Sequence, residues 1–133
     1  MPNPVFSMNP HLKIPIHSIR EESVILDSDL AKLYGVETGP FNQTIARNLK
    51  RFPKDFSFVL NRQEFMSLIS HSVISKTGRG GRTRPPRVFT EHGALMAATL
   101  LNSEKAVAMS VYVIRAFVRM RAKQSLPKNS RQW

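Results

Sequence analysis

Eleven consecutive residues, 77–87 (TGRGGRTRPPR), form the densest cluster of side chains that could bind an anion. They hold four arginines, three glycines and no acidic residue. Glycine lets a backbone approach a phosphate closely, and arginine contacts phosphates or enters a narrow minor groove. Between two strands, such a loop could be the wing of a winged helix; the alternative is a solvated surface loop without a ligand. The segment predicts phosphate contacts from Lys76, Arg79, Arg82, Arg84 and Arg87.

A second candidate lies in residues 29–48 (DLAKLYGVETGPFNQTIARN). Ala31, Gly35 and Val36 have the mutual spacing of a helix-turn-helix, in which a second amphipathic helix carries polar side chains outward. That second helix is expected over residues 39–51. Amides pair with adenine and guanidinium groups with guanine, so its polar side could read bases, although it could also be an ordinary solvated face. The predicted base contacts are Asn42, Gln43 and Arg47.

The charge of the chain favours a polyanionic partner. The 133 residues carry a net charge of +11, with a pI of about 11.0. The repulsion between so many positive charges would be offset by binding to a nucleic acid or to an anionic membrane surface. Three blocks hold basic residues and no acidic residue: residues 47–54, the 76–87 segment and the chain after Glu104. They would form one composite surface if the fold brings them together, with Lys50, Arg51 and Lys54 as further phosphate contacts.

No residues have the spacing of a catalytic or metal site. The chain has no cysteine, which excludes a disulfide framework, a thiolate nucleophile and a cysteine-based zinc site. The nine acidic residues form no obvious catalytic pair. The histidines also lack partners at triad or metal-ligand spacing: His11, His17, His71 and His92. We therefore expect a non-enzymatic protein without a cofactor or metal.

The remaining patterns indicate a small α+β domain of about five helices with a short antiparallel sheet. Strands are expected within residues 16–26, 56–60 and 87–90, and helices over 27–34, 39–51, 61–69, 91–101 and 104–123. Expected capping residues are Asp27 or Ser28, Gly35 at the end of the first helix, Asn61 with Glu64, Thr90, and Asn102 or Ser103. Residues 1–15 would be a flexible arm, 16–122 the folded domain, and 123–133 a disordered tail or the start of a linker.

The last helix is apolar nearly all round between residues 106 and 120. One stripe holds Val107, Val111, Ile114 and Val118; another holds Met109, Tyr112, Val113, Ala116 and Met120. Such a helix is normally buried on both sides, so it could be a central core helix. Alternatively, one stripe meets a second copy of the chain in a homodimer through residues 104–121.

Several motifs together resemble a KilA-N-related domain, the phage-type domain at the N-terminus of many antirepressor-like proteins and prophage regulators. The matching motifs are LDSDLAKLYGVET (26–38), RNLKRFPKDFSF (47–58), and Gly80, Gly81 and Arg82 followed by Phe89, Thr90, Glu91 and Gly93. The resemblance covers residues 16–121 and implies DNA binding and an α+β fold. Two features depart from the pattern: TRPPR replaces an aromatic-containing segment, and His92 stands where glutamine is common.

Together these observations predict a DNA-binding domain of a phage or prophage regulator that contacts duplex DNA through the 41–51 part of the second helix and the Gly/Arg-rich loop. The alternative is an antirepressor-type module that binds an acidic repressor. RNA binding is a third hypothesis, and it is less favoured because few aromatic side chains are arranged for base stacking. The apolar runs are too short to cross a bilayer and no signal peptide is read, so a cytoplasmic, nucleoid-associated protein without membrane contact is expected.

Overall fold

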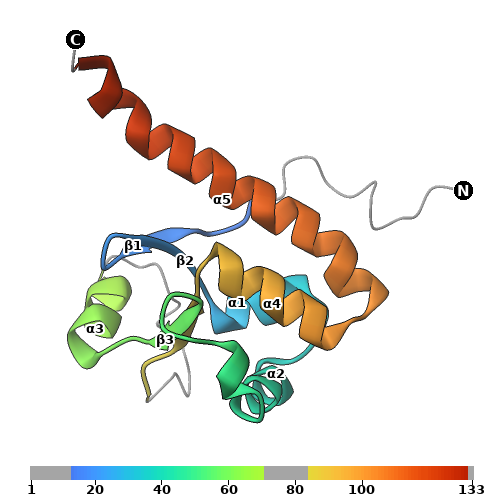
Figure 1. Cartoon of the computed structure of the whole chain (residues 1–133). Helices are drawn as coiled ribbons and strands as arrows, with labels where there is room; N and C mark the ends of the chain where they lie inside the picture. The colour runs from blue at the N-terminus through green and yellow to red at the C-terminus, as the bar shows by residue number, and fades with distance from the viewer. Residues whose placement is uncertain (1–12, 71–83, 132–133) are drawn as a thin grey trace, which may run out of the picture.

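Two short antiparallel strands lie at the centre of the fold, β2 (Glu22–Leu26) and β4 (Arg87–Phe89). β1 (His17–Ile19) pairs with the free edge of β2, and β3 (Ser57–Val59) pairs with the free edge of β4. The strand order is β1-β2-β4-β3 (Figure 1). The computed structural model describes the backbone of residues 13–70 and 84–131, with side chains up to Lys123.

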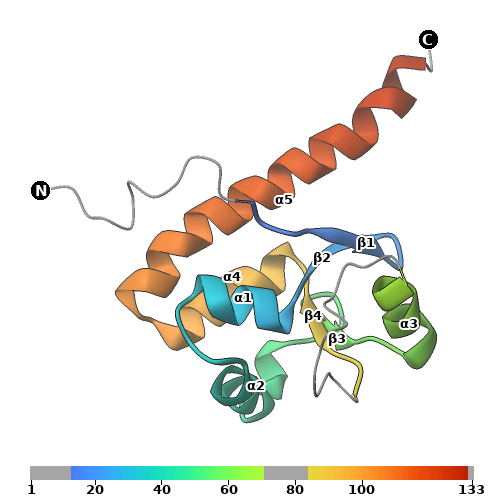
Figure 2. The same ribbon diagram turned by 180° about the vertical axis from the view of Figure 1, so that it is seen from behind.

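Five α-helices accompany the sheet in the described part of the chain, which confirms the predicted small α+β domain. Their bounds, with those of one 3-10 helix, are α1 Asp27–Leu33, α2 Thr38–Ala46, η1 Leu49–Arg51, α3 Arg62–Ser70, α4 Glu91–Leu101 and α5 Glu104–Arg131. Figures 1 and 2 show α5 running along one side of the molecule and α2 at the opposite side, with α1 and α4 between them.

The central strands are buried on both faces, and alternate side chains point to opposite sides. Ile25 and Phe89 join the larger core with residues of α1, α2, α4 and α5. Val24, Leu26 and Val88 point the other way, into a smaller cluster that includes Leu68 of α3. The sheet therefore lies between a four-helix layer and α3.

The hairpin between β1 and β2 turns at Arg20 and Glu21, both with positive φ, at 56° and 65°. Two such residues define the tight hairpin turn that matches strand twist, although asparagine and glycine are usual there. Arg20 is held by Glu64, which accepts hydrogen bonds from Nε at 2.8 Å and Nη2 at 3.0 Å, and by the Phe58 ring, 4.3 Å from its guanidinium carbon. These tertiary contacts offset the local backbone cost.

Several predicted helix ends are confirmed by their hydrogen bonds. Gly35 has a φ of +78°, and the N–H of Val36 donates to the Ala31 carbonyl at 3.0 Å, the pattern of a glycine C-cap. Asn61 and Glu64 form a reciprocal capping box, each backbone N–H donating to the other's side chain at 2.8 Å. Hydroxyl caps are also present: Thr90 Oγ1 accepts from Gly93 N–H, and Ser103 Oγ from Ala106 N–H.

The first helix begins differently from the expectation. Its N-cap position is Leu26, which makes no side-chain cap, and Asp27 is already helical. The Asp27 side chain is buried and accepts the Ser28 N–H at 2.7 Å. Asp27 therefore belongs to the interior, because β2 runs directly into α1 and carries its carboxylate inward.

The second helix is shorter than the predicted 39–51. It ends at Ala46, and a turn leads into η1. Phe41 and Ile45 of the expected apolar stripe are buried, whereas Leu49 is 50% exposed. The Asn48 amide donates to the Thr44 carbonyl at 2.8 Å, which satisfies a helix-terminal acceptor and lets the chain turn so that Phe52 enters the core.

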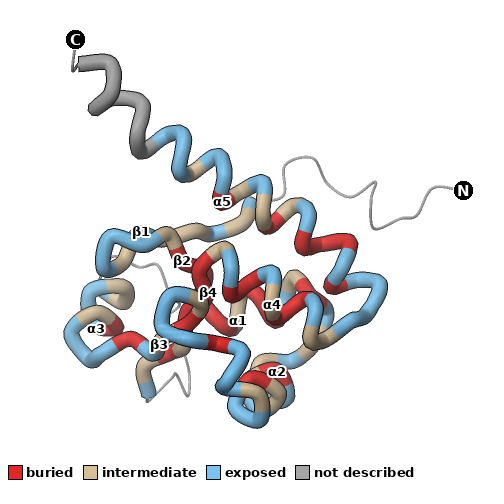
Figure 3. The backbone as a smooth tube through the Cα atoms, in the orientation of Figure 1, coloured by how far each residue is buried: buried red, intermediate tan, exposed pale blue. Residues whose placement is uncertain are grey.

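The last helix differs from its prediction in length and packing. Its backbone continues to Arg131, past the expected end at residue 123. It is not a central core helix: Ala106, Met109, Val113 and Phe117 are buried, while the stripe from Val107 to Val118 is largely exposed. Figure 3 shows this alternation of buried and exposed positions along α5.

Candidate nucleic-acid interface

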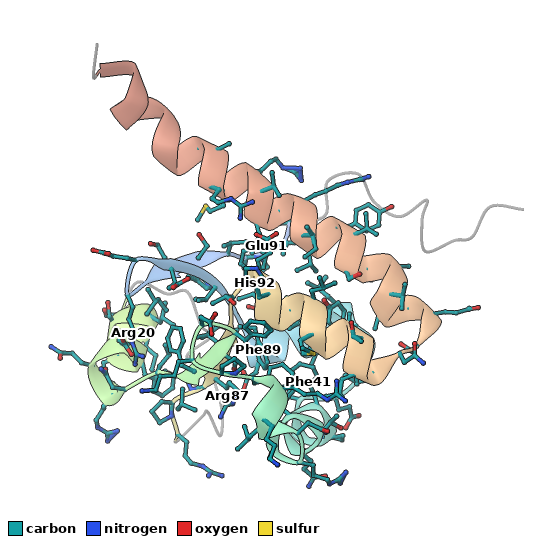
Figure 4. The ribbon with its side chains drawn as sticks, in the orientation of Figure 1. Arg20, Phe41, Arg87, Phe89, Glu91 and His92 are labelled. Carbon is teal, nitrogen blue, oxygen red and sulfur yellow. The ribbon has the colours of Figure 1, made fainter. Side chains whose placement is uncertain are left out.

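A cluster of aromatic contacts fixes α2 on the domain. The Phe41 ring lies 5.5 Å from the ring of Phe89, between centroids, and the Phe52 ring meets Phe89 edge-on at 5.9 Å. Phe41 precedes the exposed side chains of α2, and Phe52 follows the basic turn after it. Figure 4 shows Phe41 and Phe89 pointing toward one another in the interior. The surface between these anchors is therefore held in place at both ends.

The helix before α2 is fixed as well. Tyr34, at the end of α1, is buried, and its hydroxyl donates to the Ala94 carbonyl of α4 at 2.8 Å. Burial raises the pKa of this phenol well above its ordinary value, so it stays protonated and keeps the bond. This bond ties the end of α1 to α4.

Four exposed basic side chains follow the exposed part of α2. Arg47 is the C-cap of the helix, Lys50 and Arg51 lie in η1, and Lys54 follows in the next turn. Residues 47–51 also line a shallow hollow in the surface. Within the described residues, none of the four forms an ion pair. This set is available to an external anion, and we call it the basic turn.

The three predicted base-reading residues differ in their surroundings. Gln43 and Arg47 are exposed. The Asn42 amide instead points inward, where Nδ2 donates to the buried Asp27 carboxylate at 2.9 Å. The same Asp27 oxygen also accepts a long bond of 3.4 Å from the Arg87 N–H, so it joins α1, α2 and β4.

Arg84 lies three residues before β4 and Arg87 is the first residue of that strand, and the two side chains are placed differently. Arg84 is exposed. Arg87 is half-buried, and its Nη1 donates to Ser57 Oγ at 3.0 Å. Burial lowers the pKa of its guanidinium, against a smaller opposing attraction from Asp27. Arg84 is thus free to face a ligand, while Arg87 contributes mainly to the sheet.

The Gly/Arg-rich loop itself lies largely outside the described residues, as do Lys76, Arg79 and Arg82. The described chain nevertheless shows that α3 stands between β3 and this loop, so the connection is longer than a simple wing. In Figures 1 and 2, the segment that enters β4 lies at the same lower edge of the molecule as α2. Phosphate contacts from the loop remain a prediction.

The profile of the ORF6N domain matches residues 14–100, from just before β1 almost to the end of α4. The chain belongs to the ORF6N domain family. This domain is phage-associated and antirepressor-like, as the resemblance in the sequence implied. The match does not show that the chain is a KilA-N domain. No curated protein and no solved structure matches the chain.

The ORF6N match includes the α1–α2 pair, the basic turn and the start of β4, but not α5. The third basic block lies on α5, and its described side chains are Lys105, Arg115, Arg119, Arg121 and Lys123. Since α5 and α2 occupy opposite sides of the molecule (Figure 1), the three basic blocks do not form one face. Only the first block and the segment entering β4 share an edge.

Other parts of the ORF6N domain have structural contacts that the sequence did not reveal. The His92 ring stacks on Phe56, with centroids 5.4 Å apart. Glu91 accepts a hydrogen bond from Arg121 of α5. In the described ranges, no three histidine, cysteine or acidic side chains gather as metal ligands, and no helix there is both long and apolar enough to cross a membrane.

Asp27 is the site residue that sequence reasoning missed, since it orients Asn42. A single aspartate at the start of a helix is normally read as a cap. Its position directly after the apolar run VIL was the available signal, because a strand buried on both faces carries its next residue into the interior.

Proposed function

We propose that this ORF6N domain binds duplex DNA without catalysing a reaction, as the DNA-binding part of a phage or prophage regulator. In this proposal α2 enters the major groove and presents Gln43 and Arg47 to base edges. Lys50, Arg51 and Lys54 of the basic turn, together with Arg84, contact the flanking phosphates. The protein would act in the bacterial cytoplasm at the nucleoid, and a closer relationship to KilA-N domains is part of the same proposal.

The observation that carries the proposal is the exposed basic turn at the end of a helix held by the core. Lys50, Arg51 and Lys54 follow α2 within eight residues of Arg47 and are all exposed. Phosphate contacts fix the register of a protein on DNA, and base contacts from an adjoining helix give it specificity. In this proposal the end of α2 supplies the base contacts, and the basic turn beside it supplies the phosphate contacts.

In this proposal Asn42 no longer has the base-reading role that the sequence predicted. Its amide nitrogen points inward and already donates to the buried Asp27 carboxylate, so we assign Asn42 to holding α2 rather than to reading a base. Gln43 is the remaining amide on the exposed side of the helix, and a bidentate amide–adenine pair discriminates against other bases by about 1–3 kcal/mol. Gln43 and Arg47 therefore carry the expected specificity.

A selection from random duplex DNA at physiological salt tests the proposal. We expect an enriched motif, and Gln43→Ala should relax one or two of its positions while leaving the fold unchanged. Arg119→Ala with Lys123→Ala is the matched control, because it removes two charges from the opposite side of the molecule. Failure of the intact chain to retain any duplex, even at low salt, would rule the proposal out.

A protein partner is the second candidate, favoured by the antirepressor-like character of the family. The same basic surface would then bind an acidic repressor. The double variant Arg82→Ala and Arg84→Ala separates the two, with circular dichroism as the check on folding. Loss of DNA retention supports DNA binding, whereas normal DNA retention with loss of a repressor supports this second candidate.

A further inference from the structure

The outer side of α5 carries an aligned apolar stripe that the fold leaves uncovered. Val107, Val111 and Val118 are 51%, 44% and 45% exposed, and Ile114 between them is half-buried. The domain packs against a different side of the helix, through Met109, Val113 and Phe117, among others. Large apolar side chains grouped on one exposed face indicate an interaction site.

The spacing of the stripe is that of a helix-pairing seam. Its residues are separated by four, three and four positions, which is the alternation of the two apolar positions in a heptad. Such a stripe stays on one side of the helix for its whole length. Its natural complement is therefore another α-helix with the same repeat.

Charges at the two ends of the stripe indicate which helix this is. The next positions of the same repeat are Glu104 before Val107 and Arg121 after Val118. In a parallel pair of identical helices, glutamate would face glutamate and arginine would face arginine. In an antiparallel pair, each Glu104 faces Arg121 of the other copy, and like charges are kept apart. Arg121 already contacts Glu91, but its positive charge still favours an opposing acid.

We propose that the α5 stripe is the interface of a twofold symmetric dimer in which the α5 helices of two copies pair in antiparallel orientation. Val107 of one copy then packs against Val118 of the other, and Val111 against Ile114. The helix dipoles also oppose each other in this arrangement. The inference is independent of DNA binding, because it uses a helix outside the ORF6N match and on the side of the molecule away from α2.

The expected dimer is weak. One pair of helices with four apolar layers is smaller than the roughly 1,200–2,000 Å² interface of stable complexes. We therefore expect association of the free protein in the micromolar range.

Sedimentation equilibrium of the intact chain without DNA tests the proposal. We expect a monomer–dimer equilibrium that Val111→Glu weakens about 30-fold or more, because the dimer would bury two unpaired carboxylates. Met66→Glu is the matched control: Met66 is 54% exposed on α3, so the same charge added there should leave the equilibrium unchanged. A protein that stays monomeric at several hundred micromolar, or a dimer insensitive to Val111→Glu, overturns the proposal.

Disulfide cross-linking tests the orientation, and the natural chain has no cysteine to interfere. A mixture of the single variants Val107→Cys and Val118→Cys should form the mixed cross-link readily, and each variant alone should form little. Preferential cross-linking of Val107→Cys with itself would indicate parallel helices and overturn the proposal. As a second measurement, Glu104→Arg should weaken the dimer severalfold, because it would set arginine against arginine at both ends of the interface.

Discussion

Replacing Lys50 and Arg51 with alanine measures how many phosphates the basic turn neutralises. Both side chains are exposed in η1 and neither is among the buried residues, so the double variant should fold normally. Each protein–phosphate contact changes the slope of log K against log salt by about −0.9 for duplex DNA. The double variant should therefore reduce the magnitude of the slope by about 1.8.

The absolute slope follows from the described surface. The exposed basic candidates for phosphate contacts there are Lys50, Arg51, Lys54 and Arg84, which give a slope of about −3.6 if each makes one contact. Arg87 is left out because it is half-buried and bonded to Ser57. Contacts from Lys76, Arg79 and Arg82 would steepen the slope to about −6.3.

These slopes translate into large differences in affinity. With four contacts, raising salt from 50 to 200 mM should weaken wild-type binding about 150-fold, and that of the double variant only about 12-fold. Fluorescence anisotropy with a labelled duplex at four or five salt concentrations would give both slopes. Arg119→Ala with Lys123→Ala removes the same charge from α5 and is the control for a general effect of net charge.

Two results would contradict the reasoning. If the basic-turn variant keeps the wild-type slope, the turn does not contact DNA. If the α5 variant lowers the slope by the same amount, the DNA senses net charge and not a defined face. Either result would remove the structural basis for placing DNA against α2.

Three further perturbations concern stability and can be followed by thermal or denaturant unfolding. Gly93→Ala should destabilise the fold by about 3 kcal/mol or more, because a Cβ there would lie 1.8 Å from the backbone oxygen of Phe56. Asn42→Ala should cost about 1.5–3 kcal/mol, because it removes a hydrogen bond to a buried carboxylate. Burial lowers the pKa of His17 in the folded protein, so the unfolded chain takes up the proton at a higher pH than the folded chain does. The free energy of unfolding should therefore decrease as the pH is lowered from about 7.5 to about 5.5. His17→Phe should make this pH dependence weaker.

Each of these stability predictions has a control. Gly39→Ala introduces the same Cβ at a helical glycine with nothing within 4 Å, so it should be neutral or slightly stabilising. Gln43→Ala should not change stability, and equal losses from both amide variants would mean that Asn42 has no special role. A wild-type unfolding temperature that rises on acidification would contradict the assignment for His17, whose Nε2 has no hydrogen-bond partner among the described residues.

The sequence by itself determined the local elements and the general chemistry. Glycine at 35, the Asn61–Glu64 box and the Thr90 cap act within a few residues of their own position, so their patterns identify helix ends directly. The α+β class follows from the same local patterns. The net charge and the basic run after Phe41 are properties of composition, and they suggest a polyanion before any fold is known.

Tertiary structure decided which side chains are available to a partner. Asn42 and Gln43 are adjacent and chemically alike, yet one is bonded to Asp27 and the other is exposed. The last helix is apolar nearly all round, and only packing against the domain shows that one of its stripes stays uncovered. The basic blocks were separated in the same way, with α2 and α5 on opposite sides. Long-range packing sets the direction of each side chain, and residue type and spacing do not encode that direction locally.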